Sequence, residues 1–265
     1  MSSRLPTSDF RGGMITKRLQ SVKMIILVLS GKGGVGKSVV SAALAALLGK
    51  AGYAVGLMDA DIYGPSSALL FDARIRPSEG KRGLIPLVAH GVKIMSVDLF
   101  APGRPIPLAG EGARQVVKEM LALTYWGDLD YLIVDMPPAT SDIMMIFTSL
   151  EKKELAAFIV TMPDKLSLTV AHRVLHLLDS GKVSIAGVLG NMHRRDYQAG
   201  TIDDDGPRKL AKEFNVAFLG KLPYDADVTS AAEKGDIKAL LRTRFAGALG
   251  RSVGAYFHGI HDSQS

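Results

Sequence analysis

The sequence contains no cysteine among its 265 residues. Without thiols, this chain alone cannot form a disulfide, ligate zinc or an iron–sulfur cluster through cysteine, or use a thiolate as a nucleophile. Disulfide-stapled folds, cysteine-ligated zinc domains and thiol enzymes are therefore excluded. The absence says little about compartment, because a secreted protein can also lack cysteine.

The chain also lacks an apolar run long enough to cross a membrane. A spanning helix needs roughly 20 consecutive apolar residues, and no stretch of the sequence reaches that length. The basic start, residues 1–23, has no apolar run ahead of a cleavage site, and the first apolar run, 24–29, leads directly into a glycine-rich loop. We therefore expect a cytoplasmic protein.

Acidic residues are fewer than basic ones, 26 against 32, which gives a formal net charge of +6. A basic surface attracts polyanions such as nucleotides, nucleic acids and acidic lipids. The basic residues form no dense tract, and no aromatic stripe is interleaved with them, so nucleic acid and membrane partners stay open but are not favoured. A solvated surface that happens to be basic is the simpler interpretation.

Apolar runs rich in valine, isoleucine and leucine alternate with stretches of helix length along the chain. Short runs of this kind are typical of strands buried on both faces of a parallel sheet. The expected strands cover residues 24–30, 54–59, 92–97, 131–135, 156–161, 185–191 and 217–222. The clearest expected helices cover residues 37–51, 112–125, 166–179 and 207–214.

This alternation predicts an α/β fold with a doubly wound, largely parallel sheet and helices on both faces. Residues 72–92 are rich in glycine, proline and charged side chains. They interrupt the strand–helix alternation and indicate a surface excursion or hairpin. The sequence shows no linker and no internal repeat. We therefore expect residues 1–23 to be an N-terminal extension and residues 24–265 to be a single P-loop ATPase domain.

Residues 31–38 match the phosphate-loop pattern G-x-x-x-x-G-K-[ST], and they follow a predicted strand and open a predicted helix. Glycines let successive N–H groups surround phosphate oxygens, and the helix start adds the positive end of its dipole. Lys37 should reach the β- and γ-phosphates, and the Ser38 hydroxyl should ligate Mg²⁺. The predicted nucleotide-binding residues of this segment are Gly31, Lys32, Gly33, Gly34, Val35, Gly36, Lys37, Ser38 and Val39.

Lys32 occupies a loop position at which the general pattern needs no lysine. Its side chain starts beside the expected phosphates, yet the loop already has Lys37. Two interpretations stay open. Lys32 is either an ordinary exposed lysine, or it supplies charge to a nucleotide bound by a facing subunit, as an arginine finger does in trans.

Three carboxylates, Asp59, Asp61 and Asp135, end or follow two of the predicted strands. Ligands of open α/β sheets bind beyond the carboxyl ends of the strands, so all three could approach one nucleotide. Asp135 suits a water-mediated Mg²⁺ ligand, Asp59 is a further candidate for the metal site, and Asp61 suits orientation of the attacking water. A carboxylate in such a place can instead cap the next helix, and for Asp59 both interpretations stay open.

With Lys32 inside GKGGVGKS, the loop resembles the deviant Walker A class of P-loop ATPases, of SIMIBI type, that includes MinD, ParA and Mrp. Further segments resemble the Mrp (ApbC-type) subfamily more narrowly. They are residues 59–66 (DADIYGPS), 89–96 (AHGVKIMS), 126–131 (WGDLDY) and 135–138 (DMPP). The resemblance extends over about residues 23–235, most of the chain.

The resemblance implies an ATPase that binds ATP or ADP with Mg²⁺ and forms a homodimer with ATP sandwiched at the interface. Lys32 would cross that interface to the partner's nucleotide. Asp61 would lie in switch I and position the hydrolytic water, and Asp135 would begin switch II. Together with Lys37, Lys32 and Asp61 are the candidate catalytic residues.

For the base, the resemblance points to two further segments. Asn191 resembles the asparagine that recognises adenine, although an asparagine at a strand end is also a common turn former. The loop that packs on the other face of the base would consist of Pro223, Tyr224 and Asp225.

The chain also departs from the family pattern. Mrp proteins that carry clusters have a Cys-x-x-Cys pair soon after the Asn-Met, where this chain has residues 193–197, HRRDY, so a cluster bridged by its own thiolates is excluded. Ala139 and Ser141 replace glycines usual in switch II, and we therefore expect slow hydrolysis. The family's Trp-Arg-Gly-Pro segment has no counterpart around residues 107–112.

The C-terminal residues 237–260 carry apolar side chains three or four positions apart, with Arg242, Arg244 and Arg251 on the basic side. MinD proteins bind membranes with a basic amphipathic C-terminal helix, so this alternative has to be weighed. Three glycines weaken an autonomous helix here, and a terminal helix docked on the sheet has the same periodicity. We expect the docked helix.

Three functions remain open from the sequence. The first is an Mrp-type ATPase that assists iron–sulfur or metallocluster assembly without cluster ligands of its own, together with a metallocluster client or a cysteine-bearing partner. The second is a ParA/MinD-like switch whose ATP-bound dimer binds DNA, membrane or a partner protein. The third is a regulator with negligible hydrolysis. The segment 61–66 favours the first, whereas the missing cysteines and the positive charge favour the second.

Overall fold

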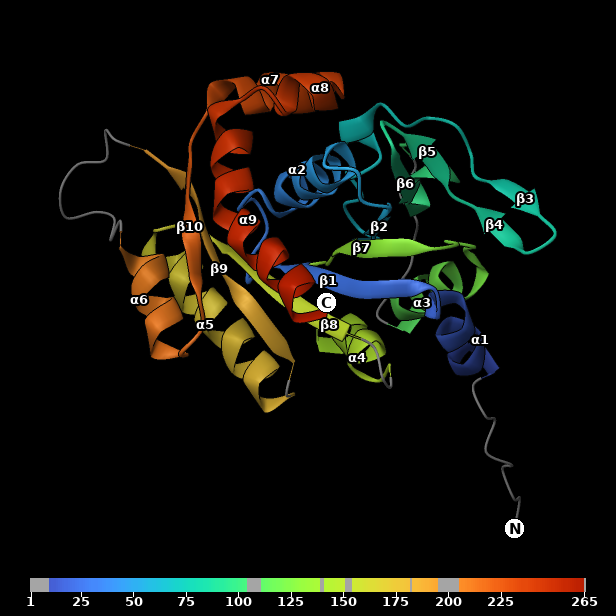
Figure 1. Cartoon of the computed structure of the whole chain (residues 1–265), viewed down its shortest axis with the longest axis horizontal. Coiled ribbons are helices and arrows are strands. Elements are labelled where there is room, and N and C mark those ends of the chain that lie inside the picture. The colour runs from blue at the N-terminus through green and yellow to red at the C-terminus, as the bar shows by residue number, and fades with distance from the viewer. Residues whose placement is uncertain are drawn as a thin grey trace, which may run out of the picture.

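The computed structural model describes residues 10–103, 111–138, 141–150, 154–181, 183–194 and 205–264. Its centre is an eight-stranded sheet in the order β10-β9-β8-β1-β7-β2-β6-β5 (Figure 1). All neighbours run parallel except β5, which is antiparallel to β6. The strands are β1 Val22–Leu29, β2 Val55–Asp59, β5 Leu87–Ala89, β6 Val92–Met95, β7 Leu129–Asp135, β8 Glu154–Thr161, β9 Ser184–His193 and β10 Phe218–Pro223.

The predicted α/β fold with a largely parallel sheet is confirmed, and each expected strand and helix is present with ends shifted by at most a few residues. The α-helices are α1 Phe10–Leu19, α2 Lys37–Lys50, α3 Glu111–Leu123, α4 Ser141–Thr148, α5 Lys165–Ser180, α6 Gly206–Glu213, α7 Ala226–Lys234, α8 Ile237–Leu240 and α9 Arg244–Gln264. Short 3-10 turns lie at η1 Leu69–Phe71 and η2 Val97–Leu99. The expected excursion contains an antiparallel hairpin, β3 Ser78–Gly80 with β4 Gly83–Ile85.

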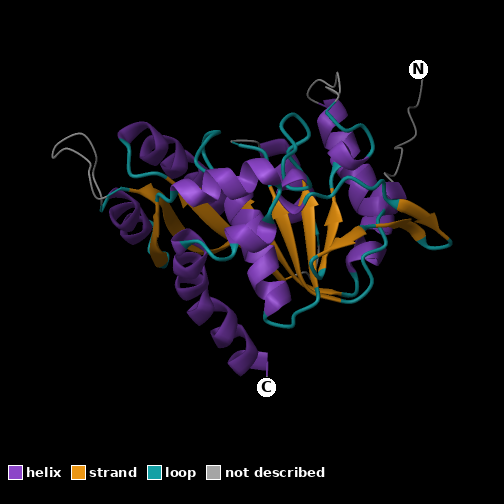
Figure 2. Cartoon of the chain, turned by 90° about the horizontal axis from the view of Figure 1, so that it is seen from above, coloured by secondary structure: helices purple, strands orange, loops and turns teal. Residues whose placement is uncertain are grey.

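Helices lie on both sides of the sheet (Figure 2). In the central strand β1 every residue but Lys23 is buried, because parallel sheets are covered on both faces and such strands need continuous apolar runs. Alternate β1 side chains then enter two different cores. Ile26 and Val28 pack with α2, α8 and α9, and Ile25 and Leu27 pack with α1, α3, α4 and α5.

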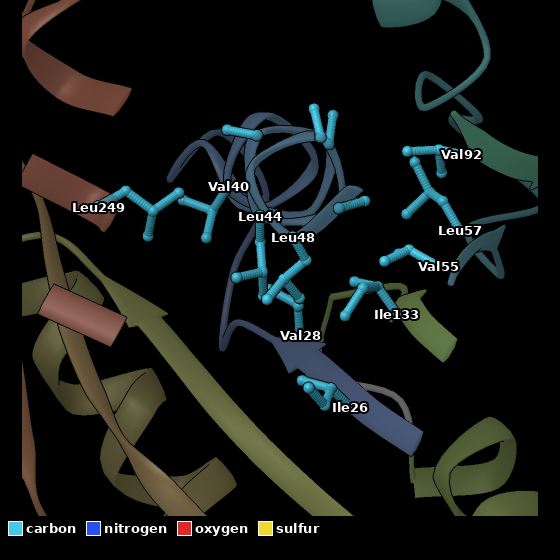
Figure 3. Packing of buried hydrophobic residues seen from close by; sticks show 14 of the residues in the cluster. Ile26, Val28, Val40, Leu44, Leu48, Val55, Leu57, Val92, Ile133 and Leu249 are labelled. Carbon is cyan, nitrogen blue, oxygen red and sulfur yellow. The ribbon is translucent and has the colours of Figure 1, made fainter. Parts of the chain in front are cut away.

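Helix α2 is apolar on almost every side because it lies between the sheet and the C-terminal helix α9. In Figure 3, Leu44 and Leu48 point toward Val28 of the sheet, whereas Val40 faces Leu249 of α9. Burial on both sides fixes the start of α2, and the phosphate loop before it, against the carboxyl end of β1.

The C-terminal helix docks on the sheet, as expected. Phe245, Leu249, Val253 and Phe257 are all at most 5% exposed. Burying side chains of this size stabilises the fold by roughly 1.5–3 kcal/mol each, so this apolar face is committed to the core rather than to a membrane surface. Among the residues described, no helix combines the length and apolar character of a membrane span.

Part of the expected N-terminal extension belongs to the core. The helix α1 packs against α3 with Ile15 and Leu19 buried, and β1 already begins at Val22. The division of the chain at residue 23 stays a prediction. The structure adds that residues 10–22 contribute apolar side chains to one face of the sheet.

Candidate functional site

The phosphate loop connects β1 to α2, and at two of its glycines a side chain would collide with neighbouring atoms. A Cβ on Gly31 would lie 2.5 Å from the backbone carbon of Val170 in α5, and one on Gly36 would lie 2.4 Å from Nδ2 of Asn191. Gly36 also has φ +83°, in the left-handed region that favours glycine. It caps α2 without a side-chain hydrogen bond, so the first N–H groups of the helix are left for an anion.

Lys37, at the start of α2, forms a buried ion pair with Asp135 at the end of β7. The distance from Nζ to Oδ1 is 2.5 Å, and the two side chains are 7% and 0% exposed. Two hydroxyls also contact the carboxylate, Ser41 donating to Oδ1 at 2.9 Å and Ser67 to Oδ2 at 3.2 Å. The phosphate-loop lysine and the strand-end aspartate, which were expected to contact phosphate and Mg²⁺ separately, are thus joined in one buried network, and their contacts with a nucleotide stay predictions.

Asp59 is paired in register with Asp135 across β2 and β7 and is fully buried. Its carboxylate accepts backbone N–H groups of Asp61 at 3.1 Å, Ser66 at 2.8 Å and Ser67 at 2.9 Å. Burial and then the nearby Asp135 charge raise the pKa of Asp59 to about 7, against the opposing effect of the Ser67 and Ser66 N–H groups and of Lys37. Asp59 therefore organises the loop after β2 rather than capping a regular helix.

The donor set at this end of the sheet fits a hard divalent cation. Two buried carboxylates face one ammonium group, so the cluster has excess negative charge when both are ionised. Ser38 adds a hydroxyl 3.4 Å from the Lys37 ammonium. Mg²⁺ prefers such oxygen ligands and keeps several waters or phosphate oxygens.

Asp61 lies beside this cluster, in the loop that follows β2. Its Oδ1 accepts the N–H of Gly64 at 3.2 Å, while its own N–H is held by Asp59. The side chain is half-buried. It is thus placed by the loop that Asp59 organises, close to the buried carboxylates and still accessible to solvent.

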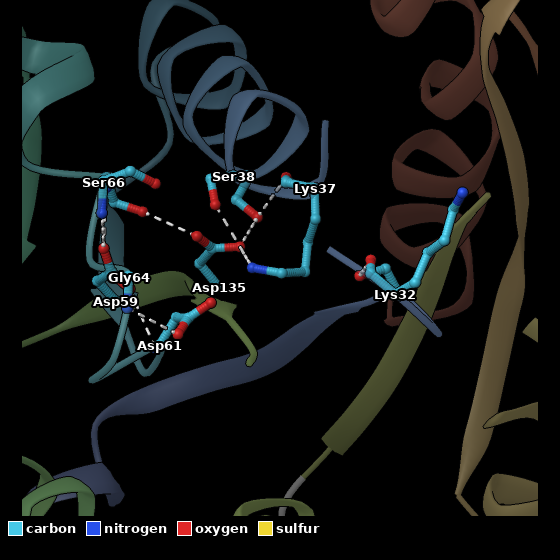
Figure 4. A network of polar contacts seen from close by, with 11 residues as sticks. Lys32, Lys37, Ser38, Asp59, Asp61, Gly64, Ser66 and Asp135 are labelled. Atoms are coloured by element: carbon cyan, nitrogen blue, oxygen red, sulfur yellow. Dashed lines mark hydrogen bonds and ion pairs between the residues drawn. The ribbon is translucent and has the colours of Figure 1, made fainter. Parts of the chain in front are cut away.

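Lys32 points away from the buried cluster, as Figure 4 shows. Its ammonium lies 3.6 Å from Oδ1 of Asp164, and the two side chains are 31% and 30% exposed. Asp164 caps α5 by accepting from the N–H of Ser167. Burial tends to raise the pKa of Asp164, but the Ser167 hydrogen bonds and the Lys32 charge outweigh it and lower that pKa.

On the side expected to hold the base, Asn191 is buried and donates from Nδ2 to the carbonyl of Val35 at 2.7 Å. This contact joins the end of β9 to the phosphate loop, next to Gly36. Val35 is buried and Val39 is half-buried. The amide is therefore next to the loop, and its recognition of a base stays a prediction.

The segment after β10 divides into an exposed and a buried part. Tyr224 is 40% exposed, and the Arg194 guanidinium lies 3.9 Å from the centroid of its ring. The Asp225 carboxylate accepts the backbone N–H groups of Asp227 at 3.2 Å and Arg244 at 2.9 Å. Asp225 thus joins the starts of α7 and α9, and a contact of Pro223, Tyr224 or Asp225 with a base stays a prediction.

Several partners in this site were not anticipated from the sequence, namely Ser41, Ser67, Asp164 and Arg194. Only Asp164 had a local signal, since an aspartate three residues before a serine at a helix start is a capping pattern. Some expectations fall outside the described residues. They concern Ala139, the side chain of Ser141, residues 107–110 and residues 195–197.

Comparison with protein families identifies the group to which this arrangement belongs. The family described as "ParA: NUBPL iron-transfer P-loop NTPase" matches residues 21–248. The chain is a member of this NTPase family. The match covers the loop, both carboxylate-bearing strands, Asn191 and the segment after β10, and it confirms the predicted resemblance.

Relatives of this NTPase family include an "Iron-sulfur cluster carrier protein" of Rickettsia typhi, 36% identical over 218 residues, which are 82% of this chain and 66% of the relative. Another of the same name, from Methanococcus maripaludis, is 32% identical over 85% of this chain and 81% of its own. The matched part of the chain therefore spans slightly less than two thirds of the length of the Rickettsia relative.

Solved structures agree with the family assignment. A nucleotide-binding protein from Archaeoglobus fulgidus, in complex with ADP, has 29% identity and a TM-score of 0.72 over 86% of this chain and 92% of its own. The cell division ATPase MinD of Pyrococcus furiosus has 20% identity and a TM-score of 0.65 over 88% of this chain and 98% of its own. The second likeness shows the shared P-loop fold alone.

Proposed function

We propose that this NTPase binds ATP with Mg²⁺, hydrolyses it slowly as a homodimer, and assists iron–sulfur or metallocluster assembly without a cluster on its own residues. The observation that supports this most is the buried Lys37–Asp135 pair beside an uncapped helix start. A lysine, two carboxylates and free N–H groups at the carboxyl ends of parallel strands are suited to a nucleoside triphosphate and a cation.

In this proposal the N–H groups of residues 31–38 surround the phosphates, and Lys37 exchanges part of its contact with Asp135 for phosphate oxygens. Ser38, Asp59 and Asp135 would hold Mg²⁺, directly or through water. A magnesium ion there neutralises charge on the phosphates. Asn191 and the segment 223–225 would contact the base.

Hydrolysis in this proposal depends on two groups at the border of the buried cluster. Asp61 would orient the attacking water from its place beside Asp59. Lys32 would leave Asp164 and contact the nucleotide of a second copy, because it points away from its own cluster. The catalytic site would then be complete only in a dimer.

The role in cluster assembly rests on the family description and on the printed names of the relatives. Because this chain offers no thiolate, the cluster or its iron would be ligated by a client or by a cysteine-bearing partner. The buried apolar face of α9 gives no support to membrane binding through that helix. A cytoplasmic location remains part of the proposal.

The catalytic part is tested with Asp61→Asn, which keeps an oxygen for the N–H of Gly64. We expect ATP affinity within about threefold of wild type and phosphate release slowed about 100-fold, the usual size of a lost water-activating group. Asp179→Asn, an exposed residue in the last turn of α5, is the matched control and should change neither. Normal turnover by Asp61→Asn would remove Asp61 from the mechanism.

The cluster part is tested anaerobically with iron and sulfide. The isolated chain should stay colourless, whereas addition of a cysteine-bearing scaffold should give visible cluster absorption that grows faster with ATP than without nucleotide. A stable brown cluster on the chain alone would contradict the assignment of ligands to the partner. Equal rates with and without ATP would contradict the role of the nucleotide.

A further inference from the structure

Ser67 contacts both buried carboxylates of the site at once. It stands between the loop after β2 and the turn η1. Its backbone N–H donates to Oδ2 of Asp59 at 2.9 Å, and its hydroxyl donates to Oδ2 of Asp135 at 3.2 Å. Ser67 is 0% exposed, as are Asp59 and Asp135. One buried residue thus joins two carboxylates that end different strands of the sheet.

The chain that follows Ser67 is anchored in the core. Ala68 is 0% exposed, and its carbonyl accepts the backbone N–H groups of Phe71 at 3.2 Å and Ala73 at 2.9 Å. The turn η1 then packs against α2 and α7. Donors on a segment held in this way keep fixed positions, so they can hold a carboxylate in one orientation.

The two oxygens of Asp135 have partners from different elements. Oδ1 accepts from the Lys37 ammonium at 2.5 Å and from the Ser41 hydroxyl at 2.9 Å, both on α2, whereas Oδ2 accepts from Ser67. In Figure 4 the carboxylate lies between Lys37 and the loop that carries Ser66. In the proposed function Lys37 turns part of its contact to phosphate oxygens. Because the carboxylate torsion of an aspartate is soft, the group would be free to rotate with Lys37 if Ser67 did not hold its other oxygen.

We propose that Ser67 is a positioning residue for the cation site, which holds the carboxylates of Asp59 and Asp135 in the orientation that one Mg²⁺ requires. Ser67 itself does not contact the cation in this proposal. The inference rests on the proposed function, because it needs both carboxylates at the same Mg²⁺. Hydrogen bonds that orient metal-ligating carboxylates typically change the metal affinity by about 10–100-fold when they are removed.

A purely electrostatic role of the Ser67 hydroxyl would have the opposite effect on the cation. A donor that only compensates charge weakens the attraction of Asp135 for Mg²⁺, so its removal should leave the Mg²⁺ affinity equal or higher. A donor that orients the carboxylate should lower this affinity when it is lost. Ser41 provides the comparison, because its hydroxyl donates to the same carboxylate from α2 and does not contact Asp59.

The test measures the affinity of the full chain for fluorescent ADP without Mg²⁺ and across a Mg²⁺ titration. Ser67→Ala keeps the N–H that Asp59 accepts and removes only the hydroxyl. ADP affinity without Mg²⁺ should stay within about twofold of wild type, and the Mg²⁺ concentration that gives half of the increase in ADP affinity should rise about tenfold. Ser41→Ala, at an equally buried position, is the matched variant and should leave that concentration equal or lower it.

Urea unfolding without nucleotide separates this effect from a general disturbance of the fold. Both variants lose one hydroxyl donor to the same carboxylate, so they should lose similar stability and differ only in their response to Mg²⁺. An unchanged or higher Mg²⁺ affinity in Ser67→Ala, or equal weakening in both variants, would overturn the proposal. Failure of the wild type to bind ADP, or an ADP affinity that does not respond to Mg²⁺, would instead count against the proposed function.

Discussion

Lys37 and Lys32 belong to the same glycine-rich loop and have opposite environments. Lys37 is 7% exposed and 2.5 Å from a fully buried carboxylate, whereas Lys32 is 31% exposed and 3.6 Å from a partly exposed one. A buried ion pair is costly to break because it leaves a charge without compensation, while a surface pair is worth little. The loop thus has one lysine fixed in place and another that can leave its partner at small cost.

The largest expected effect comes from breaking the fixed pair. Lys37→Met keeps the length of the side chain but leaves Asp135 buried without its ammonium partner. We expect a loss of about 3–5 kcal/mol in unfolding free energy and a loss of ATP binding, measured by urea unfolding at pH 7 and by fluorescent nucleotide titration.

A second variant separates lost charge compensation from lost packing. Lys37→Met combined with Asp135→Asn removes both charges of the pair and should recover part of the stability, although not the binding. Lys50→Met, at the exposed end of α2, is the control. A Lys37→Met protein within about 1 kcal/mol of wild type would show that the pair is not the buried constraint described here.

The next effect concerns pH. Because the pKa of Asp59 is raised to about 7 in the folded chain, the folded state holds a proton that the unfolded state releases near pH 4. Stability from this group is therefore present at low pH and declines as pH rises from about 4 to 7, on the order of 2–4 kcal/mol in total.

The measurement for Asp59 is the unfolding free energy in urea at pH 5, 6, 7 and 8 without nucleotide. Asp59→Asn should flatten the decline, since it cannot ionise, although it also places an amide against the N–H of Asp61. Asp179→Asn is the control with an exposed carboxylate. A wild-type decline that persists unchanged in Asp59→Asn would assign it to another group.

A smaller effect is expected from the glycines that shape the loop. Gly36→Ala combines a φ of +83° with a Cβ 2.4 Å from Asn191, whereas Gly34→Ala has a φ of +80° and open space around it. Backbone strain alone costs about 1 kcal/mol. Gly34→Ala should cost that amount, and Gly36→Ala about 1–2 kcal/mol more, because the bond from Asn191 to Val35 is also disturbed.

Equal unfolding free energies for the Gly34 and Gly36 variants would mean that the Asn191 side chain moves away from the added Cβ without a loss of stability. Gly33→Ala, with neither a left-handed φ nor a nearby atom, is the baseline. The comparison measures how tightly the base side of the site is connected to the phosphate side.

Most of the fold could be predicted because its strands are buried on both faces and so read as unbroken apolar runs, as β1 and β7 do. The helix Phe10–Leu19 could not be predicted from the sequence, because its two glycines and its basic end obscure the helical spacing of its few apolar residues. In the site, Lys37, Asp59 and Asp135 could be placed together because strand ends of a parallel sheet meet at one edge.

The partners of these residues could not be predicted in the same way. Ser67 reaches Asp135 from the loop after β2, and Asp164 reaches Lys32 from the start of α5. Both contacts depend on how loops fold over the sheet, and no local spacing encodes them.

The smallest effect on stability is expected for Lys32, the more exposed lysine of the opening comparison. Lys32→Ala removes one partly exposed pair and should change the unfolding free energy by less than about 1 kcal/mol. Its effect on function should be large in contrast, because the proposed contact forms only across a dimer. ATP binding should persist, while ATP-driven dimerisation, followed by light scattering, and phosphate release should both be lost.

Asp164→Asn tests the role of Lys32 without changing the lysine itself. It weakens the ion pair that Lys32 forms within its own subunit. It should cost equally little stability and should keep or increase ATP-driven dimerisation, because Lys32 leaves its own subunit more easily. Full turnover by Lys32→Ala would refute the role in trans. Loss of dimerisation in both variants would instead mean that the Lys32–Asp164 pair shapes the interface as a unit, and that the lysine does not act alone.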